Sequence, residues 1–278
     1  MAFSNWRIGM HIQQDAIVLV ALRYARSRWA LCRWWDIELA PGIVRHGMVV
    51  DVTALAERLQ SWRRELPLQH QVSIAFPASR TLQKQLPRPQ LSLSDRERAT
   101  WIASVMAQQL EMPAASLCVD YSAAPANNAW RVTAAQRLDI DVLRQLAARL
   151  KLSIAGIVPD ASALAAFLPW LPSGSQGLAW RNEPHWLWAT REGWGSLPCA
   201  EASSFSQLSW LIDAQSLQRC ATRSGDETAF DPWRVIHRLQ PPLPSCGDRY
   251  AVAIALRIQH SFTQIHFPVW RHQRLKHG

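Results

Sequence analysis

Lysine is scarce in this 278-residue chain, and its placement excludes a large class of nucleotide-binding enzymes. Only three of the 30 basic residues are lysines, namely Lys84, Lys151 and Lys276. A phosphate-binding P-loop requires Gly-Lys-Ser/Thr, because its backbone N–H groups cradle the phosphates while the lysine reaches their oxygens. None of the three lysines follows a glycine, so the chain has no P-loop.

Other patterns of catalytic and metal-binding residues are also missing. The sequence contains no HExxH, GxSxG or GxGxxG, and its five cysteines are far apart with no CxxC, which favours reduced thiols over zinc ligands. Asp120 and Asp160 each follow a strand-like segment, where a carboxylate can hold a metal or act as an acid or base. A turn residue and a helix N-cap are the alternatives that we favour. We therefore expect no catalytic residue, no metal and no enzymatic activity.

The formal net charge of +9 and the 15 tryptophans raise the alternative of direct nucleic-acid binding. Residues 257–278 contain four basic side chains and no acidic one, so +5 of the +9 remains for the rest of the chain. No Lys/Arg-rich block interrupts that remainder, and most tryptophans lie in apolar segments typical of a core. A mildly basic globular body with a basic tail is the simpler interpretation.

The spacing of apolar residues predicts two similar units of strands followed by a helix. Strands are expected at residues 7–10, 16–24 and 29–38, then a helix over 52–66. After a Pro/Gly/Ser-rich boundary at 169–175, strands are expected again at 177–180, 185–190 and 193–197, then a helix over 204–213. Between these units, Ser94 and Glu97 form a capping box that opens a further helix. The repetition suggests two structurally related halves.

Targeting signals are weak in this sequence. The first residues, MAFSNWRIGMH, lack an apolar core of signal-peptide length, and the longest clean apolar run covers only residues 16–22. Such a run is far too short to cross a bilayer as a helix. These observations predict a soluble, cytoplasmic protein.

Particular strings resemble the PilM family of type IV pilus assembly proteins, which are actin-like and related to FtsA. The resemblance covers roughly residues 1–256 and is strongest to a diverged enterobacterial branch described as DNA utilisation proteins. The matching strings are VSIAFPASRTLQ (72–83), PRP (87–89), VDYS (119–122), VTAAQ (132–136), PDASAL (159–164), LAWR (178–181) and FDPW (230–233).

This resemblance implies an α/β fold of the actin-like ATPase (ribonuclease H-like) type, with two related halves. Residues 1–41 and 151–170 would form the first actin-like subdomain, with a small α+β subdomain inserted at 42–150. Residues 175–258 would form a reduced, truncated second half, and 259–278 a basic, disordered tail.

The resemblance also implies where a nucleotide would bind, namely at the first hairpin of each half. In active members this hairpin carries Asp-Ile-Gly and small residues, because backbone N–H groups must approach the phosphates closely. Here the corresponding positions are altered, so we expect no cofactor, and neither ATP hydrolysis nor ATP binding. The altered positions are Gly9, Met10 and His11 in the first hairpin and Ala179, Trp180 and Arg181 in the second.

Members of the family bind the short cytoplasmic N-terminus of PilN, a single-span inner-membrane protein. The resemblance therefore implies a scaffold of a pilus-like DNA-uptake apparatus, needed for using external DNA as a nutrient and held at the inner membrane through that partner. DNA would be contacted only indirectly, self-association stays open, and an actin-like ATPase is the alternative function.

The C-terminal tail departs from the family, whose members end soon after an apolar helix. Residues 253–256 begin such a helix, and Arg257 interrupts its apolar pattern. The tail then resembles the partner's own peptide, which gives the hypothesis of a tethered pseudo-ligand in place of a plain basic tail. The residues that carry this similarity are Ile265, Phe267, Pro268, Trp270 and Arg271.

Overall fold

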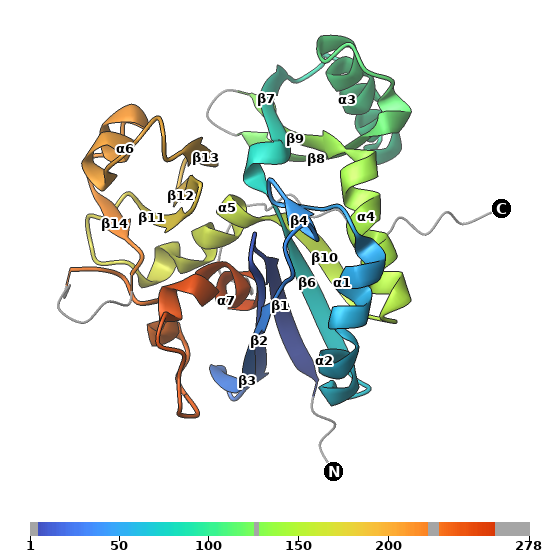
Figure 1. Ribbon diagram of the computed structural model, residues 1–278. Helices are drawn as coiled ribbons and strands as arrows, with labels where there is room; N and C mark the ends of the chain where they lie inside the picture. The colour runs from blue at the N-terminus through green and yellow to red at the C-terminus, as the bar shows by residue number, and fades with distance from the viewer. Residues whose placement is uncertain (1–4, 125–127, 222–227, 259–278) are drawn as a thin grey trace.

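The first half of the molecule is built on a five-stranded sheet. The computed structural model describes residues 5–124, 128–221 and 228–258. The strand order of the sheet is β10-β6-β1-β2-β3, in which β1, β2 and β3 form an antiparallel meander and β6 and β10 run parallel to β1 (Figure 1). Its strands are β1 (Trp6–Ile12), β2 (Ala16–Ala25), β3 (Arg28–Glu38), β6 (His70–Phe76) and β10 (Ile154–Pro159).

Three helices cover one face of this sheet (Figure 1). They are α1 (Val52–Arg58), α2 (Gln60–Glu65) and α4 (Arg137–Arg149), and a short hairpin of β4 (Val44–Arg45) and β5 (Met48–Val49) precedes α1. The helix predicted over 52–66 is divided at Leu59, whose backbone ends α1. Both parts keep their apolar residues against the sheet, with Leu55, Leu59 and Trp62 almost fully buried.

The second half has a four-stranded sheet of order β13-β12-β11-β14. Its meander of β11, β12 and β13 is antiparallel, and β14 pairs with β11 in parallel. The same arrangement occurs in the first half, where β6 pairs with β1, so the predicted repetition of the two halves is confirmed. The elements are β11 (Gly177–Asn182), β12 (His185–Thr190), β13 (Trp194–Pro198), α6 (Phe205–Leu211) and β14 (Leu217–Arg219).

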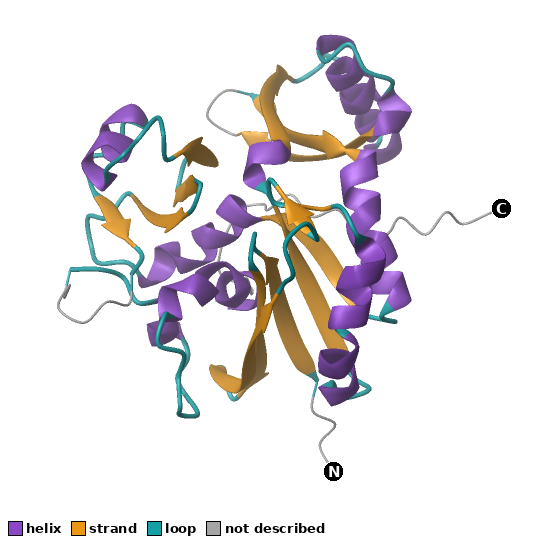
Figure 2. Cartoon of the chain, viewed as in Figure 1, coloured by secondary structure: helices purple, strands orange, loops and turns teal. Residues whose placement is uncertain are grey.

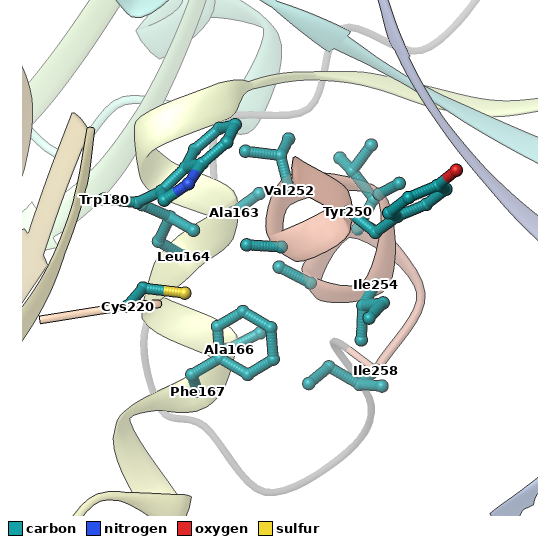
Figure 3. Packing of buried hydrophobic residues seen from close by; sticks show 14 of the residues in the cluster. Ala163, Leu164, Ala166, Phe167, Trp180, Cys220, Tyr250, Val252, Ile254 and Ile258 are labelled. Carbon is teal, nitrogen blue, oxygen red and sulfur yellow. The ribbon is translucent and has the colours of Figure 1, made fainter. Parts of the chain in front are cut away.

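Short helices fill the space between the two sheets (Figures 1 and 2). Figure 3 shows side chains of α7, such as Val252 and Ile254, packed in one cluster with Leu164 and Phe167 of η4. This cluster also includes Trp180 of the second sheet, so one apolar core joins the halves. The helical segments are α5 (Asp160–Ala163), η4 (Leu164–Trp170), η5 (Pro232–Val235), η6 (Gly247–Tyr250) and α7 (Ala251–Ile258).

A third, smaller sheet of order β7-β9-β8 carries α3 on one face. The predicted capping box is present, since the Ser94 hydroxyl accepts the Glu97 N–H while the Glu97 carboxylate accepts the Ser94 N–H. The elements are η1 (Ala78–Arg80), β7 (Thr81–Pro87), α3 (Asp95–Gln109), η2 (Ala114–Ser116), β8 (Leu117–Ala124) and β9 (Ala129–Gln136).

The inserted subdomain that contains this small sheet covers fewer residues than the insertion predicted at 42–150. The stretch from β4 to β6 and helix α4 pack within the first half, because β6 pairs with β1 and the apolar face of α4 lies against the same core. Only the segment around β7 to β9 leaves that layer. Within the second half, α7 returns to the first sheet and packs on β1.

Candidate functional site at the junction of the two hairpins

The first hairpins of the two halves meet at one hollow of about 340 Å³. The β1–β2 turn contributes Gln13, Gln14 and Asp15, and the second hairpin contributes Trp180 together with residues 181–183. The segment before α7 completes the lining with Ser245, Cys246, Asp248 and Arg249. The topology therefore brings together the two hairpins at which the sequence resemblance implies a nucleotide site.

Alternation along β1 decides which predicted site residues reach this junction. Successive strand side chains point to opposite faces, so Gly9 and His11 face α7 while Met10 faces the other way. Met10 is fully buried in the core between the first sheet and the helices α1, α2 and α4. In β11 the same rule sends Trp180 into the junction and Ala179 toward α6.

His11 and Trp180 meet across the junction. Their ring centroids are 5.8 Å apart at an interplanar angle of 64°, an edge-on contact. Burial, with a smaller contribution from the charge of Arg249, lowers the pKa of His11 to about 3. The imidazole is therefore neutral at physiological pH, and its Nδ1 lies 3.2 Å from Nε2 of Gln13. The altered positions of both hairpins thus form a contact of their own.

Arg249 binds the first hairpin from the segment that precedes α7. Its guanidinium donates to Oε1 of Gln13 at 2.7 Å and to the carboxylate of Asp15 at 2.7 Å, and it lies 3.4 Å from the carboxylate of Asp36. Gln13 donates in return to the backbone carbonyl of Arg249 at 3.1 Å. These bonds tie β1, β2 and β3 to the segment before α7.

The second hairpin carries a similar set of internal contacts. The indole N–H of Trp180 donates to Asp248 at 3.4 Å, and exposed Arg181 pairs with Glu183 at 2.6 Å. Altogether three carboxylates and two guanidiniums line the hollow. This set of side chains does not fit a magnesium-bound triphosphate, because the long side chains of Trp180 and Arg181 stand in the second hairpin, where small residues would be needed for backbone N–H groups to approach the phosphates.

Gly9 has a different use in this molecule. A Cβ at this position would lie 1.8 Å from the backbone carbonyl oxygen of Ala253. The glycine is therefore required for the close approach of α7 to β1, whatever the chemistry of the neighbouring turn.

The remaining predicted residues lie elsewhere. Asp160, the first residue of α5, accepts the backbone N–H groups of Ala78 at 2.8 Å and Ala161 at 2.7 Å, and burial raises its pKa to about 7. It therefore joins α5 to η1. Asp120 lies on β8, away from the hairpin junction. The tail residues Ile265, Phe267, Pro268, Trp270 and Arg271 fall outside the described residues.

Sequence inspection alone misses Arg249 and Asp36 as members of the site. Both are far in sequence from the hairpin turns, and neither belongs to a recognisable motif. Only Gln13 and Asp15 carry a local signal, the polar turn between two apolar strands.

Two features are absent from the part of the chain that the structure describes. Within it, no group of three or more His, Cys, Asp or Glu side chains is arranged to hold a metal ion. No helix in these ranges has the length and apolarity needed to span a membrane.

The two related halves, the inserted small sheet and the meeting hairpins define an actin-like α/β fold. The chain superimposes on a chain of the PilM-PilN type IV pilus biogenesis complex with a TM-score of 0.65, covering 91% of this chain and 97% of that one at 14% identity. It also matches the cytoplasmic domain of EpsL, an inner membrane component of the type II secretion system of Vibrio cholerae, with a TM-score of 0.56, 12% identity and coverage of 90% and 92%. No family model matches the sequence.

Sequence similarity assigns the chain to one family. The chain is 42% identical over 264 residues to the DNA utilization protein HofM of Escherichia coli (strain K12), and the match covers 94% of this chain and all of its relative. The chain therefore belongs to the HofM family of DNA utilization proteins.

Proposed function

We propose that the protein is a non-enzymatic scaffold of a pilus-like DNA-uptake apparatus. It binds the short cytoplasmic N-terminal segment of a PilN-like inner-membrane protein and supports the use of external DNA as a nutrient. It works on the cytoplasmic side and reaches the inner membrane through that partner, while contact with DNA is indirect.

The observation that carries this proposal is the contact of His11 with Trp180, closed on one side by Arg249. In an actin-like protein that uses ATP, the two hairpins hold phosphates between the halves. Here the equivalent space is bridged by side chains of the chain itself, so the two halves are joined without a nucleotide. The family membership and the shape shared with the PilM chain support the assignment of the partner.

A binding assay tests the partner. The full chain is titrated into a fluorescently labelled peptide that copies the N-terminal cytoplasmic segment of the PilN-like protein, with a scrambled peptide of the same composition as control. We expect saturable binding of the native order only. A version lacking residues 259–278 tests the pseudo-ligand hypothesis, which predicts tighter peptide binding after the deletion.

A second assay tests the absence of nucleotide chemistry. The same preparation is titrated with a fluorescent ATP analogue in the presence of Mg²⁺. Binding at low micromolar concentration that unlabelled ATP displaces would favour the actin-like ATPase instead. In the peptide assay described above, equal binding of the native and scrambled peptides would contradict the scaffold proposal.

A further inference from the structure

Two arginines meet on the inner face of the first sheet, away from the hairpin junction. Arg7 lies two residues before Gly9 on β1 and therefore faces the same side, toward α7. Arg257 lies four residues after Ala253 on α7, one turn further along the helix. Since Ala253 packs on Gly9, Arg257 lies over the part of the sheet that holds Arg7.

The guanidinium of Arg257 is buried with incomplete hydrogen bonding. The residue is only 7% exposed, and one of its nitrogens donates to the hydroxyl of Ser73 on β6. Its Nε is buried and has no hydrogen-bond partner. Burial, together with the positive charge of Arg7, lowers the pKa of Arg257 to about 10.

Arg7 presents the same deficit from the neighbouring strand. Its Nη1 is buried without a hydrogen-bond partner, and the guanidinium carbon stands 5.7 Å from the centre of the Trp29 ring. Part of the side chain remains accessible, so the pair can be reached from solvent on this side. Among the described residues, no carboxylate forms an ion pair with either arginine.

The adjoining segments of the chain offer no acidic side chain either. Residues 1–5 precede Arg7 and residues 259–278 follow α7, and neither stretch contains Asp or Glu. Two adjacent positive charges, one of them almost fully buried, are strongly unfavourable unless an anion compensates them. No carboxylate among the described residues supplies this counter-charge, and an anion from solution can supply it.

We propose that Arg7 and Arg257 form a binding site for a phosphate dianion, either free or as the monoester group of a small molecule. Two guanidiniums supply two positive charges and several donors, which match the charge of about −2 and the acceptor oxygens of a phosphate group better than the single charge of a carboxylate. The bound anion would hold the end of α7 on β1 and β6.

Thermal unfolding and calorimetry of the full chain test this site. Inorganic phosphate, glycerol 3-phosphate and acetate are each added at constant ionic strength maintained with NaCl. We expect inorganic phosphate at 20 mM to raise the midpoint by about 4 °C, as for a ligand of millimolar affinity. Equal responses to the two phosphates assign the site to any monoester group, and a response to inorganic phosphate alone assigns it to the free ion.

Substitutions place the effect at the two arginines. Arg257→Met and Arg7→Met should each weaken phosphate binding at least about tenfold, while Arg64→Met, an exposed position on α2, removes the same charge and should bind as the wild type does. Arg257→Met is expected to fold, because replacing an uncompensated buried charge with an apolar side chain relieves its desolvation penalty.

Three results would overturn the proposal. The first is a midpoint of thermal unfolding that is the same in phosphate as in NaCl at equal ionic strength. The second is an equal loss of phosphate binding in Arg257→Met and Arg64→Met. The third is an acetate response as large as the phosphate response, which would remove the claim of a dianion site.

Discussion

Asp160→Asn should expose a pH dependence of stability that the wild-type chain conceals. Two buried groups have pKa values that are shifted in opposite directions, and they lie in different parts of the first half. His11 at the hairpin junction is 3% exposed and Asp160 at the start of α5 is 6% exposed. Both pKa values are far from those of the unfolded chain, so both link folding to pH.

His11 makes acid unfavourable for folding. Its folded pKa of about 3 lies below its ordinary value of 6.5, so its stabilising contribution is complete above pH 6.5 and is lost as the pH falls toward 3. Between pH 6.5 and 5 the shift covers about 1.5 pH units, which corresponds to a loss of about 2 kcal/mol in the free energy of unfolding.

Asp160 has the opposite effect. Burial raises its folded pKa to about 7 from an ordinary value of 3.8, so its contribution is complete below pH 3.8 and is lost as the pH rises through 7. Acidification from pH 6.5 to 5 therefore gains about 2 kcal/mol from this group. The two contributions offset each other in the wild-type chain.

The assay is urea unfolding followed by tryptophan fluorescence and circular dichroism between pH 5 and 7.5. Asp160→Asn keeps an oxygen that accepts the N–H groups of Ala78 and Ala161, and it leaves the slope of His11 uncompensated. The double variant with His11→Asn keeps an acceptor for Gln13 and removes the imidazole. The single variant should lose about 2 kcal/mol more than the double variant between pH 6.5 and 5.

This comparison isolates one group, because every other titrating side chain is common to both variants. Equal pH slopes of the single and double variants would refute the reasoning, since His11 would then not remain neutral in the folded protein. The wild type and His11→Asn provide the same difference with Asp160 present.

Three further predictions concern packing and hydrogen bonds. Gly9→Ala should lower the free energy of unfolding by at least about 3 kcal/mol, because its Cβ meets the carbonyl of Ala253, whereas Gly193→Ala, with open space around its Cβ, should change it by less than about 0.5 kcal/mol in the same urea titration. Ser94→Ala should lower the free energy of unfolding by about 1 kcal/mol by removing the capping box, and circular dichroism should show a loss of helicity in α3. An unchanged midpoint of urea unfolding would contradict this prediction. Arg249→Met should cost about 2 kcal/mol, since its bonds to the first hairpin are charge-assisted but partly exposed, and a loss below about 0.5 kcal/mol would show that these bonds do not hold the junction.

Much of the fold was predictable because its signals are local. The run of apolar and β-branched residues marks β2, alternation with aromatic residues marks β3, the Ser94–Glu97 pair marks the start of α3, and the two meanders repeat within the sequence. The width of the inserted subdomain was not predictable in the same way. Whether β6 joins the first sheet depends on parallel pairing with β1, a contact between segments about 60 residues apart.

The residues of the candidate site likewise separate into those with a local sequence signal and those placed by contacts between distant segments. The sequence by itself determined that Met10 and His11 stand in the first hairpin and that Trp180 and Arg181 stand in the second, because residue type at a given strand position is a local property. Only the tertiary structure decided that His11 meets Trp180, that Arg249 joins the first hairpin, and that the charge of Arg7 acts on buried Arg257. Each of these pairs comes from segments that are distant in the chain. Their proximity follows from the packing of α7 and the second sheet on the first, which no spacing rule within one segment contains.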